Sequence, residues 1–311
     1  MGDVYKGIDW EELVRRVVHH SCTGIAPDAE RLLREAEGAE DEPAAKSVLG
    51  SMIENIGMAG RLDKPVCQSP GFPAVYITFG RNARMPDFAG IFGQVIPEMV
   101  GKGFIRPSIV HPLTRKNTGD STGPGVPNFE YDYRPEAGYV ELIVSFKACG
   151  AELMNAYKTF TSSTLGDGLK GLKRFVVSQV VEAKGIPCPP GAIGIGIGGQ
   201  MDVAARLSRR AVSVREWDDI NPDPMLADLE AELLETINGT GIGPGGTGGR
   251  TTALAVKALM AYTHTAIAPV AVNFHCWVAR RAGVRVHDDG RVEMLFWRCE
   301  QSWPNTSSRS R

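Results

Sequence analysis

The sequence predicts an α/β fold with a mixed β-sheet, flanking helices and an N-terminal helical layer. Two observations support this prediction. Before residue 67 apolar residues recur at helical spacing, and after it short apolar strands alternate with amphipathic helices. No internal repeat or linker divides the 311 residues cleanly. We therefore expect a helical layer over residues 1–66, an α/β region over residues 67–300 in the same domain, and a loose polar tail over residues 301–311.

Three helices are predicted in the N-terminal layer. Asp9 can cap the first, whose apolar side chains fall on one face: Trp10, Leu13, Val14, Val17 and Val18. The second is expected over residues 28–36 and the third over residues 44–58. Packing alone explains these patterns, so we expect the layer to be structural.

The elements after residue 67 follow from apolar runs bounded by glycine and proline. Strands are predicted over residues 72–79, 139–146, 192–199 and 267–274. Helices are predicted from residue 86, over 165–183 and 202–212, from Asp223-Pro224 to Gly239, and over 251–262. Loops are expected at 111–127 and 241–249, because both segments are rich in turn residues.

The charge balance argues against a nucleic-acid-binding protein. The chain has 34 Lys and Arg against 36 Asp and Glu, a formal net charge of −2, whereas such proteins carry a strongly basic face. No apolar run approaches the roughly 20 residues that span a bilayer, so no membrane partner is expected. The N-terminus has acidic residues where a secretory signal has a basic and then an apolar stretch. We therefore expect a cytoplasmic protein whose six cysteines are free thiols or metal ligands.

Three cysteines share a context that suits a metal ligand. Cys67, Cys149 and Cys188 each lie near glycine or proline at a predicted strand or loop boundary, where stiff, irregular backbone can present sulfur outside a helix. The alternative is that each is a buried structural cysteine. Their long separations match neither a zinc-finger nor a ferredoxin pattern, so tertiary structure would have to bring them together. For Cys276, at the end of an apolar strand, packing is the better explanation.

Two glycine-rich runs raise the question of nucleotide binding. The run 194–199 precedes a predicted helix, but its glycine spacing departs from the dinucleotide-binding fingerprint and no convincing ribose-binding acid follows. Close approach of a strand and a helix is the simpler interpretation. The run 243–249 lacks the lysine of a phosphate loop, although its amides could form a nest for a carboxylate.

Polar residues on two segments could bind a substrate. Arg106 interrupts an apolar stretch, where its guanidinium can pair bidentately with a substrate carboxylate or form a structural salt bridge. A glycine-containing loop adds an amide, a hydroxyl and a carboxylate through Asn117, Thr118, Gly119 and Asp120.

Taken as a set and in this order, the motifs resemble the class I (iron–sulfur) fumarase and L-tartrate dehydratase family, and more narrowly its α subunits. The resemblance runs from about residue 44 to about residue 290. The motifs are Cys67-Gln68 before a turn, Ile105-Arg106-Pro107, Asn117-Thr118-Gly119, Lys147-Ala148-Cys149-Gly150, Cys188-Pro189-Pro190 with the following glycine run, Gly241-Ile242-Gly243-Pro244, and the segment from Ala268 through Cys276-Trp277 to Arg280-Arg281.

The resemblance implies an oxygen-sensitive [4Fe–4S] cluster held by Cys67, Cys149 and Cys188. Three thiolates would hold three irons and leave the fourth without a protein ligand. Such an open iron can act as a Lewis acid on a 2-hydroxy acid. Gln68 and Arg106 match family positions that contact substrate carboxylates, and the loop 117–120 matches one that lines the same pocket.

One departure concerns the substrate. The family usually has Cys-Gln-Asp-Thr-Gly, whereas this chain has Ser69 in place of the acid, at a position that we assign to the substrate pocket. Because this removes a carboxylate, we expect the substrate to be neither ordinary malate nor fumarate. It should still be of the tartrate or malate type, which are 2-hydroxy acids.

The resemblance also implies a partner. The family's catalytic base and further basic substrate-binding residues lie in a β subunit or a C-terminal domain, so we expect a hydro-lyase that is active only with a β subunit, as an α2β2 assembly. Two alternatives stay open. The chain could be a non-catalytic or regulatory relative that keeps the fold, or the three cysteines could hold a structural zinc ion.

Overall fold

A computed structural model describes residue 5, residues 7–69 and residues 71–297, so the tail predicted over 301–311 lies outside the described residues. The α/β prediction is confirmed, because the chain folds into helices and two mixed sheets. The chain forms two compact units. Unit 1 comprises Met1–Pro27, Asp63–Phe146 and Arg280–Arg311, and unit 2 comprises Asp28–Leu62 and Lys147–Ala279.

Unit 1 is built on a five-stranded sheet in the order β2-β1-β3-β8-β9. The strands are β1 (Phe72–Phe79), β2 (Asn128–Tyr133), β3 (Tyr139–Lys147), β8 (Arg280–His287) and β9 (Val292–Leu295). β1 and β2 pair in parallel, whereas β8 pairs antiparallel with β3 and with β9, so the sheet is mixed.

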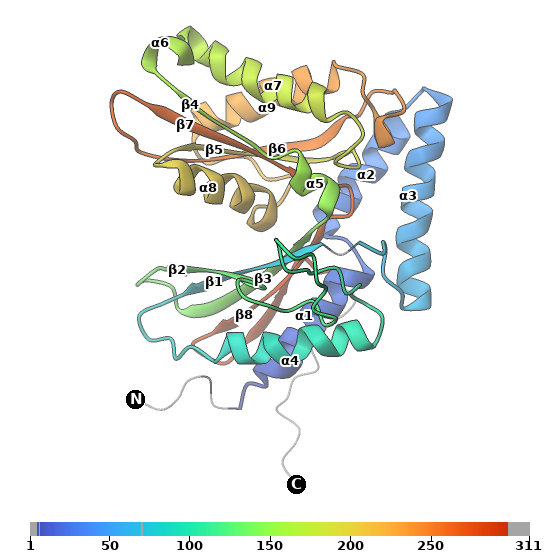
Figure 1. Cartoon of the computed structure of the whole chain (residues 1–311), viewed down its shortest axis with the longest axis vertical. Helices are drawn as coiled ribbons and strands as arrows, with labels where there is room; N and C mark the ends of the chain where they lie inside the picture. Colours follow the sequence, from blue (N-terminus) through green and yellow to red (C-terminus); the bar gives the residue numbers. More distant parts are fainter. Residues whose placement is uncertain (1–4, 6, 70, 298–311) are drawn as a thin grey trace. The chain divides into compact units, whose positions relative to one another are not determined.

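Two helices supply apolar faces to unit 1, α1 (Trp10–Thr23) and α4 (Phe88–Gly101) (Figure 1). The predicted cap of α1 is confirmed, since the Asp9 carboxylate accepts a hydrogen bond of 2.9 Å from the Glu12 amide. The predicted apolar face of this helix is buried, and Phe92 of α4 joins it in the same core. Burial of these side chains is the main force that holds the helices to the sheet.

Unit 2 is built on a four-stranded sheet in the order β4-β7-β5-β6. The strands are β4 (Ala156–Phe160), β5 (Gly191–Gly198), β6 (Ala253–Ala261) and β7 (Ala268–His275). Helices α7 (Lys170–Ala183) and α9 (Pro224–Asn238) cover one face, and α8 (Met201–Val214) covers the other (Figure 1). The remaining helices of this unit are α2 (Pro27–Ala39), α3 (Pro43–Leu62), α5 (Cys149–Leu153), α6 (Ser162–Leu165), η1 (Asp167–Leu169) and η2 (Pro244–Gly246). The helices of the predicted N-terminal layer therefore form, with α1 in unit 1 and α3 in unit 2.

One predicted helix is wrong. The segment 251–262 instead contains strand β6 (Ala253–Ala261), which pairs in parallel with β5. Helices α8 and α9 both contact β6, so most of its residues are buried and its apolar run is nearly continuous. Such a run cannot be distinguished from a buried helix by periodicity alone.

The glycines of β5 let α8 lie directly on the strand. A Cβ atom on Gly196 would lie 1.9 Å from the Ala204 carbonyl oxygen, and one on Gly194 would lie 2.1 Å from the Ser208 carbonyl oxygen. Both distances are far below van der Waals contact, so only glycine fits. The packing interpretation of the run 194–199 is confirmed.

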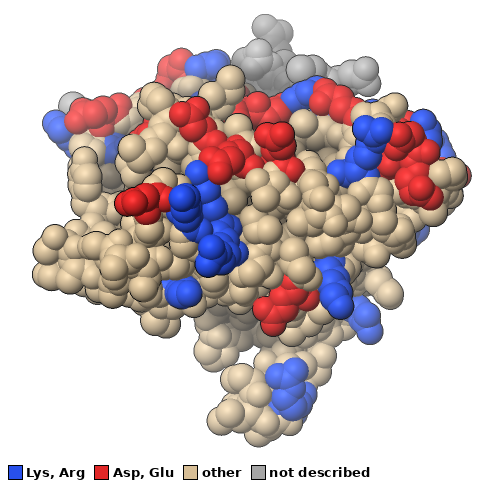
Figure 2. All heavy atoms as spheres, turned by 90° about the horizontal axis from the view of Figure 1, so that it is seen from above, with Lys and Arg blue, Asp and Glu red and all other residues tan. Residues whose placement is uncertain are grey.

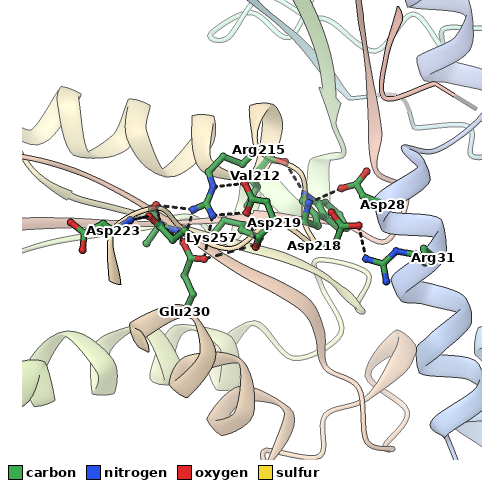
Figure 3. Close-up of polar contacts among 12 residues, drawn as sticks. Asp28, Arg31, Val212, Arg215, Asp218, Asp219, Asp223, Glu230 and Lys257 are labelled. Carbon is green, nitrogen blue, oxygen red and sulfur yellow. Dashed lines mark hydrogen bonds and ion pairs between the residues drawn. The ribbon is translucent and has the colours of Figure 1, made fainter. Parts of the chain in front are cut away.

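A buried network of charges fixes the connection from α8 to α9 in unit 2 (Figure 3). The Glu230 carboxylate accepts hydrogen bonds from Arg215 (2.5 Å), from the Asn221 amide group (2.6 Å) and from the Ala258 backbone amide (2.7 Å). Lys257 of β6 donates to Asp219 (2.9 Å). Within this network, the buried Lys257 and the half-buried Arg215 therefore each face a carboxylate, as burial of charge requires.

Acidic and basic side chains lie close to one another over the face that Figure 2 shows, without a broad field of either sign. Among the described residues, none of the helices combines the length and the hydropathy that crossing a membrane would need.

Candidate functional site

Unit 1 carries the first predicted cysteine. Cys67 lies in the turn between α3 and β1, with a half-buried thiol, and Gln68 beside it is exposed. The backbone of this turn is fixed by Arg280, whose Nη2 donates to the Cys67 carbonyl oxygen at 3.0 Å. Arg280 is fully buried, and its Nε and Nη1 have no hydrogen-bond partner among the described residues. A buried cation with unused donors next to Cys67 favours a nearby anionic group.

The second predicted segment of unit 1 folds into a loop that brings Arg106 and residues 117–121 together. The Asn117 side chain donates to the Pro107 carbonyl oxygen (2.8 Å), and the Ser121 hydroxyl donates to the Arg106 carbonyl oxygen (3.1 Å). Thr118 donates to the Ile109 carbonyl oxygen (3.3 Å). The two segments therefore form one structure, as a shared role would require.

Within this loop, some predicted substrate-binding side chains already have partners. The side-chain oxygen of Asn117 accepts a hydrogen bond from the Gly119 amide (2.7 Å). Hydrogen bonds from the backbone and hydroxyl of Thr122 hold the pKa of Asp120 below its ordinary value. Arg106 differs, because its exposed guanidinium has no ion-pair partner in the described part of the chain. Among the predicted substrate-binding side chains of this loop, Arg106 is thus the cation that is available to an anion.

Unit 2 carries the other two cysteines on neighbouring segments. Cys149 begins the short helix α5, and Cys188 lies in the turn between α7 and β5; both thiols are exposed. A Cβ atom on Gly150 would lie 2.2 Å from the Ile186 carbonyl oxygen, so the two backbones touch there. The Cys188 thiol also approaches that carbonyl oxygen, at 4.0 Å. The glycine after Cys149 is therefore needed for the close approach of the two cysteine segments.

A polar cluster that sequence analysis did not single out lies beside Cys149. Lys147, which is 2% exposed, pairs with Glu152 at 2.9 Å and donates to the Asn273 side chain. Arg209 of α8 also pairs with Glu152, at 3.1 Å. Within unit 2, the cluster ties Lys147 to α5, α8 and β7. A lysine that ends the apolar run 139–146 was the available signal.

The cluster perturbs two ionisation equilibria. Burial lowers the pKa of Lys147 to about 8, although Glu152 opposes this shift. Burial would raise the pKa of Glu152, but the charges of Lys147 and Arg209 outweigh it and hold that pKa below its ordinary value. Glu152 is therefore an anion at neutral pH, held between two cations.

Burial separates the three candidate ligands from the two other described cysteines. Cys22 and Cys276 are buried in the cores of their units, and burial raises the pKa of the Cys22 thiol to about 12. Metal ligation requires a thiolate, so Cys22 is a poor ligand. The packing role predicted for Cys276 agrees with its burial.

Most amides of the glycine-rich run 243–249 already donate hydrogen bonds within the chain. The amides of Gly245, Gly246, Thr247 and Gly248 donate to backbone carbonyl groups, and the Gly243 amide donates to the Thr252 hydroxyl. These five amides are therefore not available to form the predicted nest for a carboxylate.

The described residues contain no group of three or more His, Cys, Asp or Glu side chains placed to hold a metal ion within the geometry shown. Cys67 belongs to unit 1, whereas Cys149 and Cys188 belong to unit 2. The three-cysteine site therefore stays a prediction.

Comparison with known proteins adds a family and several relatives. Residues 11–285 match the family described as fumarate hydratase (fumerase). A Methanocaldococcus jannaschii protein provisionally named L(+)-tartrate dehydratase subunit alpha is 37% identical over 287 residues, which are 90% of this chain and 99% of that protein. The L(+)-tartrate dehydratase subunit alpha of Escherichia coli (strain UTI89 / UPEC) is 30% identical over 285 residues, which are 91% of this chain and 93% of the relative.

A third relative is longer than this chain. A Geobacillus stearothermophilus protein provisionally named class I fumarate hydratase is 30% identical over 292 residues, which are 92% of this chain and 56% of that protein.

Proposed function

Because the chain belongs to the fumarate hydratase (fumerase) family, we propose that it is the α subunit of an iron–sulfur hydro-lyase that reversibly dehydrates a 2-hydroxy dicarboxylic acid of the tartrate or malate type. The observation that carries the proposal is the match along nearly the whole length of proteins named as tartrate dehydratase α subunits. The hydro-lyase class follows from the family, and the cofactor, the partner and the substrate are the proposed parts.

Cys67, Cys149 and Cys188 would hold the [4Fe–4S] cluster. The donor set fits this group, because all three thiols are exposed or half-buried and two of them lie on touching segments. The unused donors of Arg280, next to Cys67, suit an anionic cluster as well. When bound, a cluster with one iron free of protein ligands supplies a Lewis acid for the hydroxyl and carboxylate of the substrate.

The chain's own contribution to substrate binding would come from Arg106 and Gln68. The exposed guanidinium of Arg106 can form two parallel hydrogen bonds to a carboxylate, which fixes the orientation of the acid as well as its charge. Gln68 can donate its amide to the same or the second carboxylate. Asn117, Thr118, Gly119 and Asp120 would act mainly by shaping the loop that carries Arg106, since their polar groups are engaged within it.

Ser69 would set the substrate preference. A hydroxyl at this position can donate or accept a hydrogen bond but brings no negative charge, in contrast to the acid that relatives usually have. Ser69→Asp should therefore shift the ratio of kcat/KM values toward malate. An unchanged ratio would contradict this role.

The base that removes the substrate proton would lie on a partner β subunit. The match to relatives named as subunit alpha supports a partner, as does the Geobacillus protein, of which this chain matches only 56%. We propose an α2β2 assembly in which neither subunit alone is active.

The test is co-expression with a candidate β subunit and anaerobic purification, followed by iron and sulfide analysis, EPR spectroscopy and hydratase assays on several hydroxy acids. Cys67→Ser, Cys149→Ser and Cys188→Ser should each lower the iron content and the activity. Cys22→Ala is the matched control. The Cys22 thiol is buried and is not a proposed ligand, so this variant should retain the cluster.

Three results would contradict the proposal in different ways. A colourless protein with stoichiometric zinc would replace the cluster with a structural zinc site. A cluster-bearing complex inert toward all the acids would indicate a non-catalytic relative. Full activity of this chain alone would remove the need for a β subunit.

A further inference from the structure

The glycine-rich loop 241–249 packs directly on the turn 185–190 that carries Cys188. A Cβ atom on Gly246 would lie 2.7 Å from the Gly185 Cα atom, and one on Gly185 would lie 2.7 Å from the Gly245 carbonyl oxygen. The Gly245 amide donates to the Pro189 carbonyl oxygen at 2.8 Å. The two backbones are therefore in contact, with no room for a side chain between them.

The backbone of Cys188 is held in a conformation that non-glycine residues rarely adopt. Its φ angle is +56°. Its amide donates to the Gly185 carbonyl oxygen (3.1 Å), and its carbonyl oxygen accepts from the Trp277 amide (3.2 Å). Such a conformation persists only where the surroundings determine it. The result is an exposed thiol on a fixed main chain.

The far end of the loop is anchored by a buried carboxylate at the corner between α2 and α3. Glu40 is 3% exposed, and its Oε2 accepts from the Arg250 amide at 2.8 Å. Its Oε1 accepts from the amides of Asp41 (3.2 Å) and Glu42 (3.1 Å). The Arg250 side chain pairs with Asp41, with 2.7 Å between Nε and Oδ1. Gly249 lies so close that a Cβ atom there would be 2.8 Å from the Glu40 Oε2 atom.

We propose that the loop 241–250, anchored by Glu40, positions the Cys188 thiol. Gly245 and Gly246 hold the turn through direct backbone contact, and Glu40 acts on it through the loop. Positioning residues of this kind keep a metal ligand in place without touching the metal. That a well-positioned Cys188 thiol helps to bind iron rests on the proposed function. The effect of the loop on the Cys188 backbone does not depend on that function.

Two alanine substitutions in the same loop separate this role from simple destabilisation. Gly246 (φ +79°) and Gly248 (φ +92°) share the left-handed conformation, so alanine is strained at both positions. Only Gly246→Ala brings a Cβ atom against the Cys188 turn, because Gly248 has open space within 4 Å. The Gly248→Ala variant is thus the matched control.

The first measurement uses the full chain without metal. Hydrogen exchange over residues 184–191 should be at least about tenfold faster in Gly246→Ala than in Gly248→Ala. The ratio of the alkylation rates of Cys188 and Cys149 should also change in Gly246→Ala alone, since general destabilisation would affect both thiols. Equal exchange rates and equal ratios in the two variants would overturn the proposal.

The second measurement covers the case in which Gly246→Ala does not fold. Glu40→Ala should accelerate exchange over residues 184–191, and Glu42→Ala, at the same corner, should not. Glu40→Gln keeps an acceptor for the Arg250 amide and should restore much of the protection. If Glu40→Ala leaves exchange unchanged, the anchoring role is wrong.

The rate of iron release tests the proposed function and the positioning of Cys188 together. Its outcomes distinguish failure of one proposal from failure of the other. In the reconstituted complex with the β subunit, a chelator should remove iron faster from the Glu40→Ala variant than from the Glu42→Ala variant. If the unmodified complex never binds iron, the proposed function fails while the exchange result stands. If it binds iron and both variants release it at the same rate, positioning of the ligand is refuted.

Discussion

Replacing Glu230 with alanine tests whether the buried charge network of unit 2 determines its stability. Glu230 lies on α9 with its side chain 8% exposed, and it accepts hydrogen bonds from Arg215, Asn221 and the Ala258 amide (Figure 3). Without it, Asp219 alone faces the half-buried Arg215 and the buried Lys257. The Ala258 amide would also lose its acceptor.

The magnitude follows from these two losses. Removing one partner of a buried ion pair costs about 3–5 kcal/mol, because it leaves an uncompensated buried charge. Leaving a buried amide unpaired costs about 1–3 kcal/mol. The two costs share one site and do not add fully, so we expect Glu230→Ala to lower the free energy of unfolding by about 4–6 kcal/mol. Glu230→Gln keeps an oxygen for the amide and should cost roughly 2 kcal/mol less.

The assay is urea unfolding followed by circular dichroism, with Glu232→Ala as the control. Glu232 lies on the same helix and pairs with Lys173, but its side chain is 55% exposed. Exposed pairs contribute about 0–1 kcal/mol, so this variant should unfold close to the original protein. If Glu230→Ala and Glu232→Ala differ by less than about 1 kcal/mol, the network does not stabilise the unit as argued.

Three further predictions concern packing, acid stability and a single hydrogen bond. Gly196→Ala should lower the melting temperature, since forcing α8 off β5 costs about 1–3 kcal/mol or more, whereas Gly93→Ala, with open space around it in α4, should leave it unchanged or raise it. Burial opposes ionisation of Asp219, but hydrogen bonds from its cationic partners hold its pKa below the ordinary value; the stability that it contributes is present above about pH 4 and is lost as the pH falls through the folded-state pKa. The unfolding free energy of Asp219→Asn should therefore fall less steeply on acidification, and parallel pH profiles would contradict this. Tyr5→Phe removes a 2.7 Å hydrogen bond to Asp288 and should cost about 1 kcal/mol in urea unfolding, while a loss of several kcal/mol would indicate a packing role instead.

Sequence signals predicted the elements that short-range physics controls. Asp9 caps α1, and Asp223 caps α9 by accepting from the Met225 and Leu226 amides at 2.9 and 3.3 Å. Both signals act over one helical turn, so they are visible in the residues themselves. Strand β6 is different, because its identity depends on pairing with β5, which is far away in the sequence.

Strands that sequence analysis missed depart from the usual strand pattern in two different ways. β2 and β4 are short and largely exposed, so they lack the apolar runs by which strands were recognised. β8 begins with two arginines that are buried in the fold, Arg280 and Arg281. A charge at the start of a buried strand contradicts the usual pattern, and only its tertiary partner, such as the Cys67 carbonyl for Arg280, explains it.

The candidate site also depends on tertiary contacts that the sequence does not reveal. Neighbouring glycines and prolines mark Cys149 and Cys188 as residues on irregular backbone, and the exposed thiols agree with that interpretation. The contact between Gly150 and Ile186 leaves no trace in either segment alone. The local sequence therefore indicates candidate ligands, whereas tertiary contacts determine which of these ligands lie close together.

The two glycine-rich runs show most clearly that the same residue types can serve either ligand binding or backbone packing. The runs 194–199 and 243–249 both contain the residues that phosphate and anion sites need, because glycine lets a backbone amide approach a ligand. Glycine equally lets one backbone approach another, and here the first run meets α8 and the second meets the Cys188 turn. Whether an amide is available to a ligand depends on its other possible partners, such as the Pro189 carbonyl that receives the Gly245 amide. In the second run, Gly246 lies against the Cys188 turn and Gly248 does not, which is why substitution at these two positions should have different effects.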